Sequence, residues 1–283
     1  SVSGGCIEGD VIVEADGVMT SEQAVMLEYG VSNSDAWKVG LACGGRIRVL
    51  LQPVDAVLQG LLVRLQEARA KKCPTVLASC TDSGESALYS AGEALMLGGS
   101  DLSSEAEAAL AADRPRLIEA AEAQVFLNVF NPPLRLYIIG AVHITQALAP
   151  MARLAGFEVT VIDPRGAFLS TARLSGIRGI EDWPDVVLEA EGLDRRAAVI
   201  TLTHDPKLDD AALSVALKSE AFYIGCLGSK KTHAARLGRL GGLGFDAEAL
   251  GRIHGPVGLK IGARSPSEIA ISAIAQMIGE LHS

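Results

Sequence analysis

The sequence predicts an α/β protein, with a Rossmann-like, doubly wound parallel sheet in its C-terminal half and a mixed α+β domain before it. Apolar strand-like runs alternate with helical spacing after residue 133, which is typical of parallel sheets. The chain is 49% hydrophobic but only 4% aromatic, a composition typical of sheets rich in Val, Ile and Leu. Asn131-Pro132-Pro133 interrupts the chain, because consecutive prolines prevent a continuous helix. We expect two domains, residues 1–131 and 132–283.

A strand, a glycine turn, a helix and a second strand open the C-terminal half. Residues 136–139 are the apolar run Leu-Tyr-Ile-Ile, which ends at Gly140. Helical spacing follows over 144–155, and a β-branched run over 157–162 ends at Asp163. This order predicts two parallel strands joined by a crossover helix.

The alternation continues to the C-terminus. Strands are expected over 197–203 and 222–227, with helices over 209–217 and after Ser229. Ser265-Pro266-Ser267-Glu268 combines an N-cap serine, a proline at the first helical position and a glutamate three residues after the cap. A helix is therefore predicted to begin there.

The N-terminal half shows no regular alternation of strands and helices. Three strands are expected, over 46–51, 75–78 and 125–130, and an amphipathic helix over 55–70. The Ala- and Glu-rich segment 103–121 predicts a second helix. These elements indicate a mixed α+β domain. Because the chain begins at Ser1 inside a motif, we expect that it lacks a first segment.

Charge and cysteine usage exclude several classes of protein. The net charge is −9, without a long basic run, so nucleic acid and anionic membranes are not expected partners. No apolar run reaches the roughly 20 residues of a membrane span, and no signal-like segment is present. The cysteines form no CxxC pair, so spacing predicts no metal site. We expect a cytoplasmic protein with free thiols, at Cys6, Cys43, Cys73, Cys80 and Cys226.

The first strand end of the C-terminal half resembles a dinucleotide-binding turn. Ligands of doubly wound sheets bind beyond the carboxyl ends of the strands. Gly140 supplies a tight turn, while Asp163 follows at about the 20-residue spacing of an acid that binds ribose hydroxyls. Val142 stands where a second glycine would let a pyrophosphate approach, which disfavours ordinary NAD geometry. We predict a nucleotide-containing or phosphate-bearing ligand here; the alternative is that Asp163 only caps a loop.

Other polar residues fall on the same predicted rim. Gly228-Ser229-Lys230-Lys231 lies at the start of a predicted helix, where free N–H groups and ammonium charges favour an anion. The alternative is that this segment is a solvated basic turn. Each histidine is a catalytic or binding candidate whose alternative is a structural role. The candidates are His204 for catalysis, and His143, Asp205, Gly228, Ser229 and Lys230 for cofactor binding.

Two cysteines lie beside glycine pairs, in Gly4-Gly5-Cys6 and Cys43-Gly44-Gly45. The glycines permit a close approach by a bulky ligand. A helix beginning near Cys6 would favour its thiolate, the form that metal ligation or sulfur transfer requires. The alternative is a small hydrophobic residue in a tight turn.

Together these segments resemble the XdhC/CoxI family, in order over almost the whole chain. The segments that carry the resemblance are SVSGGCIEGDV, DAWKVGLACGGRIRVLLQPV, RLYIIGAVHITQALAPMARLAGFEVTVIDPR, LTHDPKLDDAAL, YIGCLGSKKTHAARLGRL and RIHGPVGLKIGARSPSEIAISAIAQMI. The resemblance implies an N-terminal XdhC domain followed by a Rossmann domain, in an accessory protein for molybdenum hydroxylases such as xanthine dehydrogenase and carbon monoxide dehydrogenase.

The resemblance further implies that the protein binds the molybdenum cofactor, assists its sulfuration and delivers it to an apo molybdenum hydroxylase. The cofactor is a pterin dithiolene bearing a phosphate, in some hydroxylases extended by a nucleotide such as cytosine. A cysteine desulfurase would be the second partner, and a homodimer is expected. By the resemblance the cofactor would contact both glycine–cysteine turns, Gly140, His143 and Asp163, with molybdenum near Cys6 or Cys43.

Two alternatives belong to other classes of protein. The first is an NAD(P)-dependent oxidoreductase, against which Val142 argues. The second is a docking protein that holds the desulfurase against the apoenzyme and binds no cofactor. The resemblance favours a cofactor-binding maturation factor over an enzyme with turnover.

Overall fold

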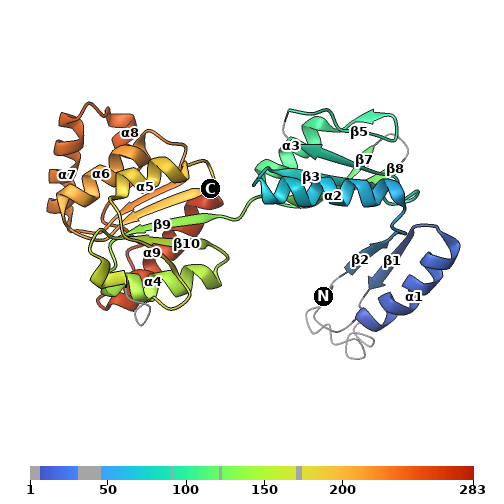
Figure 1. Cartoon of the computed structure of the whole chain (residues 1–283), viewed down its shortest axis with the longest axis horizontal. Coiled ribbons are helices and arrows are strands. Elements are labelled where there is room, and N and C mark those ends of the chain that lie inside the picture. The colour runs from blue at the N-terminus through green and yellow to red at the C-terminus, as the bar shows by residue number, and fades with distance from the viewer. Residues whose placement is uncertain (1–6, 31–45, 91, 121–122, 170–173) are drawn as a thin grey trace. The chain divides into compact units, whose positions relative to one another are not determined.

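The computed structural model describes residues 7–30, 46–90, 92–120, 123–169 and 174–283. The chain divides into two compact units, Ser1–Pro132 and Pro133–Ser283 (Figure 1). Within the described ranges, every helix is too short or too polar to serve as a membrane span.

The C-terminal unit contains a six-stranded parallel sheet, which confirms the predicted fold class. Its spatial order is β11-β10-β9-β12-β13-β14, so β9, the first strand of this unit, lies at the centre. The chain adds strands outward from β9 first on one side and then on the other. This is the Rossmann order, and its switch point lies between β9 and β12. The strands are β9 (Arg135–Ile139), β10 (Glu158–Ile162), β11 (Arg178–Ile180), β12 (Ala197–Thr201), β13 (Tyr223–Cys226) and β14 (Ile253–His254).

Both faces of this sheet are buried, as expected of parallel strands. Leu136 and Ile138 of β9 belong to the core beneath α4 and α9, whereas Tyr137 and Ile139 belong to the core beneath α5 and α6. The helices are α4 (His143–Leu154), α5 (Pro184–Glu191), α6 (Pro206–Leu217), α7 (Lys230–Gly242), α8 (Ala247–Gly251) and α9 (Pro266–Leu281), and Gly166–Leu169 forms a 3-10 turn.

The predicted start of α9 is confirmed. The Ser265 hydroxyl accepts from the Glu268 amide at 3.2 Å, and the Glu268 carboxylate accepts from the Ser265 amide at 2.9 Å. This reciprocal capping box satisfies backbone donors that the helix leaves free, and such a cap stabilises a helix by about 1 kcal/mol.

The described part of the N-terminal unit contains two antiparallel pairs, β1-β2 and β5-β6, and a four-stranded antiparallel sheet of order β4-β3-β8-β7. One face of the larger sheet packs against α3 through Val76, Ala78 and Leu127, and α2 packs against β3 and β4. The elements are α1 (Glu8–Ser21), β1 (Val25–Gly30), β2 (Arg46–Leu51), α2 (Ala56–Ala70), β3 (Thr75–Cys80), β4 (Ser86–Ser90), β5 (Met96–Leu97), β6 (Ser100–Asp101), α3 (Ser103–Ala111), β7 (Arg116–Ala120) and β8 (Ala123–Phe130).

The predicted helix over 103–121 is wrong in its second half. Helix α3 ends at Ala111, Asp113 has a left-handed φ of 49°, and Pro115 cannot donate a helical hydrogen bond. Residues 116–120 instead form β7, which pairs with β8. Pairing with an existing strand therefore overrides the helix propensity of this segment.

Candidate functional site

The first glycine turn meets the loop after β12 at the switch point of the Rossmann sheet. Gly140 follows β9 with φ +104°, and a Cβ built on it would lie 2.5 Å from Thr203 Cγ2. Only glycine permits both this backbone conformation and this contact. The structure thus brings together two of the predicted strand ends, those of Gly140 and His204.

Helix α4 begins at this turn without a side-chain cap. Its N-cap residue is Val142, which offers no oxygen to the first-turn amides, and His143 is exposed at the first helical position. The Thr145 hydroxyl donates to the Gly140 carbonyl oxygen and so holds the turn against the helix. The partial positive charge at such a helix end favours a negatively charged group.

Asp163, the acid predicted to contact ribose, is fully buried and bonded within the protein. Its carboxylate accepts from the Ala141 amide at 2.9 Å, from the Arg165 amide at 3.0 Å, and from Arg165 Nε and Nη2 at 2.8 Å each. Burial acts to raise the Asp163 pKa, but the hydrogen bonds from Arg165 and Ala141 outweigh it and lower the pKa. The carboxylate is therefore ionised, and its contact with a ribose stays a prediction.

Arg165 is the rim residue that the sequence interpretation missed. Its side chain is 46% exposed, and its guanidinium also lies 4.7 Å from the centre of the Phe168 ring. Pairing with Asp163 raises the Arg165 pKa. The sequence signal that could have identified it is an arginine placed two residues after the acid at the end of a strand. The end of β10 consequently presents a fixed cation beside the glycine turn, because the Asp163 oxygen that accepts from Ala141 also accepts from Arg165.

His204 and Asp205 occupy the loop after β12. His204 is exposed and has a left-handed φ of 64°, which is uncommon for a residue other than glycine and is found at functional sites. Asp205 caps α6 by accepting from the Lys207 amide at 2.9 Å, and its charge acts on Arg165. Its predicted role in cofactor binding stays a prediction beside this capping role.

A buried ion pair is hydrogen-bonded to the loop that follows β12. Arg236 of α7 and Asp209 of α6 lie 3.4 Å apart and are each 2% exposed, and Arg236 also donates to the Leu227 carbonyl at 2.9 Å. Thr203 donates to Asp209 at 2.7 Å. Burial raises the Asp209 pKa despite these hydrogen bonds. The pair links the ends of β12 and β13, and no sequence motif indicated it.

The Gly228-Ser229-Lys230 segment forms the predicted start of a helix. Gly228 has φ +146°, and the Ser229 hydroxyl accepts from the Thr232 amide at 3.1 Å as the cap of α7. Gly228 and Lys230 line a cavity of about 990 Å³, together with Lys260 and other residues of 254–263 and of α9. Lys230 is thus an exposed cation at a hollow of the C-terminal unit.

The residues of both glycine–cysteine turns, Gly4, Gly5, Cys6, Cys43, Gly44 and Gly45, lie outside the described residues. In the described part of the chain, no cluster of three or more His, Cys, Asp or Glu side chains could hold a metal ion. Of the cysteines described there, Cys226 is buried, and burial raises its pKa to about 11. Such a thiol is inert at neutral pH.

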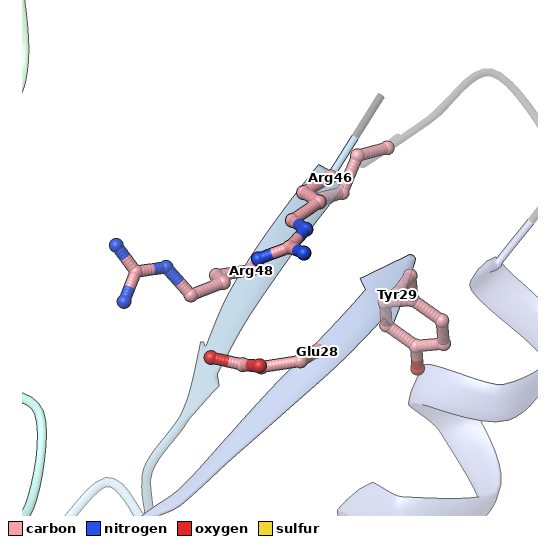
Figure 2. A pocket seen from close by; sticks show the side chains of 5 residues that line it. Glu28, Tyr29, Arg46 and Arg48 are labelled. Atoms are coloured by element: carbon pink, nitrogen blue, oxygen red, sulfur yellow. The ribbon is translucent and has the colours of Figure 1, made fainter. Parts of the chain in front are cut away.

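A polar hollow lies on the β1–β2 pair of the N-terminal unit. Glu28 and Tyr29 of β1 and Arg46 and Arg48 of β2 line it, as Figure 2 shows. Tyr29 points toward α1, and burial together with Asp10 and Glu14 of that helix raises its pKa. The two arginines give this strand pair a cationic edge.

Comparison with known proteins connects this geometry to a family. Residues 136–277 match the XdhC Rossmann domain. The chain belongs to the XdhC family. This confirms the predicted family. The match covers the Rossmann sheet and every strand end described above.

Relatives extend the similarity beyond the Rossmann domain. The chain is 28% identical to the molybdenum cofactor insertion chaperone PaoD of Escherichia coli, over 98% of this chain and 72% of PaoD. It is 25% identical to a probable xanthine dehydrogenase subunit of Bacillus subtilis, over 98% of this chain and 82% of that protein. The E. coli protein YqeB, described as uncharacterized, is 31% identical over 54% of this chain but only 28% of YqeB.

A solved structure shares the fold over the whole chain. It is a crystal structure described as a xanthine dehydrogenase from Bacillus halodurans, with 28% sequence identity and a TM-score of 0.72. The superposition covers 99% of this chain and 81% of that chain. The N-terminal unit therefore belongs to the shared architecture.

Proposed function

We propose that this XdhC-family protein is a molybdenum-cofactor insertion chaperone that serves a molybdenum hydroxylase. The observation that carries the proposal is the similarity to PaoD over 98% of the chain. The Rossmann rim adds physical support, because its exposed groups at the switch point suit an anionic ligand.

The rim residues fit the phosphate end of the cofactor. Arg165 supplies a guanidinium whose orientation is fixed by Asp163, and the α4 N-terminus at His143 supplies amide donors without a side-chain cap. Gly140 lets a ligand approach the backbone. We assign the phosphate to these groups, with Lys230 as a further cation of the same unit; when bound, the cofactor itself would supply the pterin dithiolene and the molybdenum.

The finer parts of the function remain proposals. Cys6 and Cys43, with their flanking glycines, are our candidates for contact with molybdenum or for sulfur transfer. An apo hydroxylase and a cysteine desulfurase are the proposed partners, and a cytoplasmic homodimer is the proposed form. The cytosine dinucleotide form of the cofactor would extend from the same phosphate.

The geometry argues against use of the rim for hydride transfer with NAD(P). Val142 occupies the position of the second glycine, and the acid that would bind ribose hydroxyls already bonds to Arg165 and Ala141. A nicotinamide dinucleotide would have to displace these hydrogen bonds. The rim therefore suits a phosphate better than a ribose diol.

Native mass spectrometry tests the proposal on the full chain coexpressed with molybdenum-cofactor synthesis. The expected result is a bound mass equal to the cofactor, together with activation of an apo hydroxylase by the loaded protein. A protein that carries no cofactor yet still activates the apoenzyme would support the docking alternative instead. A bound nicotinamide dinucleotide would contradict the proposal.

A further inference from the structure

A second hollow in the N-terminal unit has the size and lining of a small-molecule pocket. It is a cavity of about 450 Å³ between the β1–β2 pair and the four-stranded sheet. Pockets for small ligands typically measure about 300–1,000 Å³ and combine apolar walls with a few polar groups. We call it the hairpin cavity; its lining includes Arg48 and Gln52 from β2 and the residue after it, and Leu77, Leu117, Phe126 and Asn128 from the sheet.

The register of the sheet explains why apolar and polar side chains meet there. Phe126 of β8 is paired with Ser79 on one side and with Leu117 on the other, while Asn128 is paired with Leu77. These residues alternate with Val76, Ala78, Val125 and Leu127, which face the α3 core. The cavity therefore lies on the sheet face opposite α3.

Several polar groups of this cavity have hydrogen-bonding capacity to spare. Gln52 Oε1 is buried and finds no donor among the described residues, although its amide nitrogen donates to Ser86. The Asn128 side chain makes no hydrogen bond within the described part of the chain. Arg48 donates one bond to Gln124 at 3.2 Å and has further donors. Gln52 Oε1 is closed off from the cavity, whereas Asn128 is half-buried and Arg48 is exposed, so these two side chains are the ones that a ligand can reach.

We propose that the hairpin cavity binds a flat heteroaromatic ring with an amide edge, such as a pterin. The Asn128 side-chain amide offers one donor and one acceptor, which complement the N–H and carbonyl of such an edge. Arg48 can donate to a carbonyl oxygen or nitrogen of the ring, and Phe126, Leu77 and Leu117 cover the apolar faces. The choice of pterin rests on the proposed function, because the molybdenum cofactor contains that ring.

The lining distinguishes this ligand from two others. A hydrocarbon ligand would displace water from the Asn128 amide without replacing its hydrogen bonds. A phosphate group would meet one arginine, Arg48, against a wall of Leu77, Leu117 and Phe126. A planar ring with polar edges is the class that uses both kinds of lining.

Free pterin is the probe, titrated into the full chain and followed by its own fluorescence anisotropy. Binding should weaken about tenfold or more in Asn128→Leu, which keeps the branched shape and the number of heavy atoms but removes the amide, since one lost hydrogen-bonded pair corresponds to about that factor. Quinoxaline, a bicyclic ring without an amide edge, should bind more weakly than pterin and be insensitive to Asn128→Leu. Guanine, which carries the same amide edge, should compete with pterin.

A pair of arginine variants supplies the matched control. Arg48→Met should weaken pterin binding, whereas Arg46→Met, two residues away on the same strand and outside this cavity, should not. Thermal unfolding of every variant separates loss of binding from loss of fold. Absence of pterin binding to the wild-type protein, or equal binding by wild type, Asn128→Leu and Arg48→Met, would overturn the proposal.

Failure of this inference is distinguishable from failure of the proposed function. If wild-type protein retains the molybdenum cofactor and Asn128→Leu and Arg48→Met retain it equally, the pocket assignment is wrong and the chaperone proposal stands. If wild type retains no cofactor but pterin binding follows the predicted pattern, the pocket assignment stands and the chaperone proposal is wrong.

Discussion

The Arg165 guanidinium lies side-on against the buried Asp163 carboxylate, with Nε and Nη2 each 2.8 Å from an oxygen. Because the carboxylate is fixed by the Ala141 amide as well, the arginine is held beside the glycine turn rather than free to sample solvent. A fixed guanidinium loses little conformational freedom when it binds a phosphate. This pair therefore gives the proposed phosphate site a fixed cation, supported by the acid that the sequence interpretation assigned to a ribose.

Removal of the Arg165 guanidinium should weaken cofactor retention. Arg165→Ala is expected to lower the retained molybdenum cofactor about tenfold or more, because a charge-assisted hydrogen bond contributes about 1.5–3 kcal/mol. Arg165→Lys should restore only part of the retention, since an ammonium cannot bond side-on to Asp163. Cofactor content per protein is the measurement.

Arg195→Ala is the matched control for that experiment. Arg195 is exposed and pairs with Glu220. It precedes β12 and therefore lies at the amino ends of the strands, away from the rim formed by their carboxyl ends. Its removal should leave cofactor content unchanged. Equal retention by Arg165→Ala and Arg195→Ala would contradict the phosphate assignment.

Two buried aspartates, Asp163 and Asp209, should make the free energy of unfolding depend on pH in opposite directions. The Asp163 pKa is lowered below its ordinary value of 3.8, so its stabilising contribution is present above that value and is lost as pH falls through the folded-state pKa. The Asp209 pKa is raised above 3.8, so its contribution is present below that value and is lost as pH rises through the folded-state pKa.

Urea unfolding of the wild type, Asp163→Asn and Asp209→Asn between pH 3 and pH 7 measures both effects. Relative to wild type, Asp163→Asn should lose more stability at neutral than at acidic pH, whereas Asp209→Asn should become comparatively more stable as pH rises. Parallel pH profiles for the two variants would refute the assignment of opposite shifts.

Replacing only one residue of the Asp209–Arg236 pair should strongly reduce the free energy of unfolding, whereas replacing both residues together should reduce it much less. Arg236→Met leaves a buried carboxylate without its partner, and such a loss costs about 3–5 kcal/mol. The double variant Asp209→Leu/Arg236→Met removes both charges and should recover most of that stability. A double-mutant cycle by chemical unfolding provides the test, and additive losses would show that the two residues are not coupled.

The Rossmann half could be predicted from sequence because its signals are local. Each strand is a short apolar run, and Ser265 and Glu268 identify a helix start from four consecutive residues. The α3–β7 segment could not be predicted in this way, because its second half becomes a strand only through pairing with β8. The same contrast holds for the site. Gly140 follows from a motif and Arg165 lies two residues from its partner Asp163, whereas the role of Arg236 depends on Asp209, a residue of another helix that only folding brings near.

Gly140 should resist substitution because it meets two constraints at once. Gly140→Ala places a Cβ at a φ of +104° and 2.5 Å from Thr203 Cγ2, so a loss of about 1–3 kcal/mol is expected, with reduced cofactor retention. Adding Thr203→Ser removes that methyl group while keeping the hydroxyl that bonds Asp209, and should restore part of the stability. Gly238→Ala is the control, because Gly238 lies inside α7 with open space around its Cβ position and should gain about 0.5–1 kcal/mol. If Thr203→Ser restores nothing, backbone strain alone accounts for the loss and the contact between the two strand ends does not hold the turn in place.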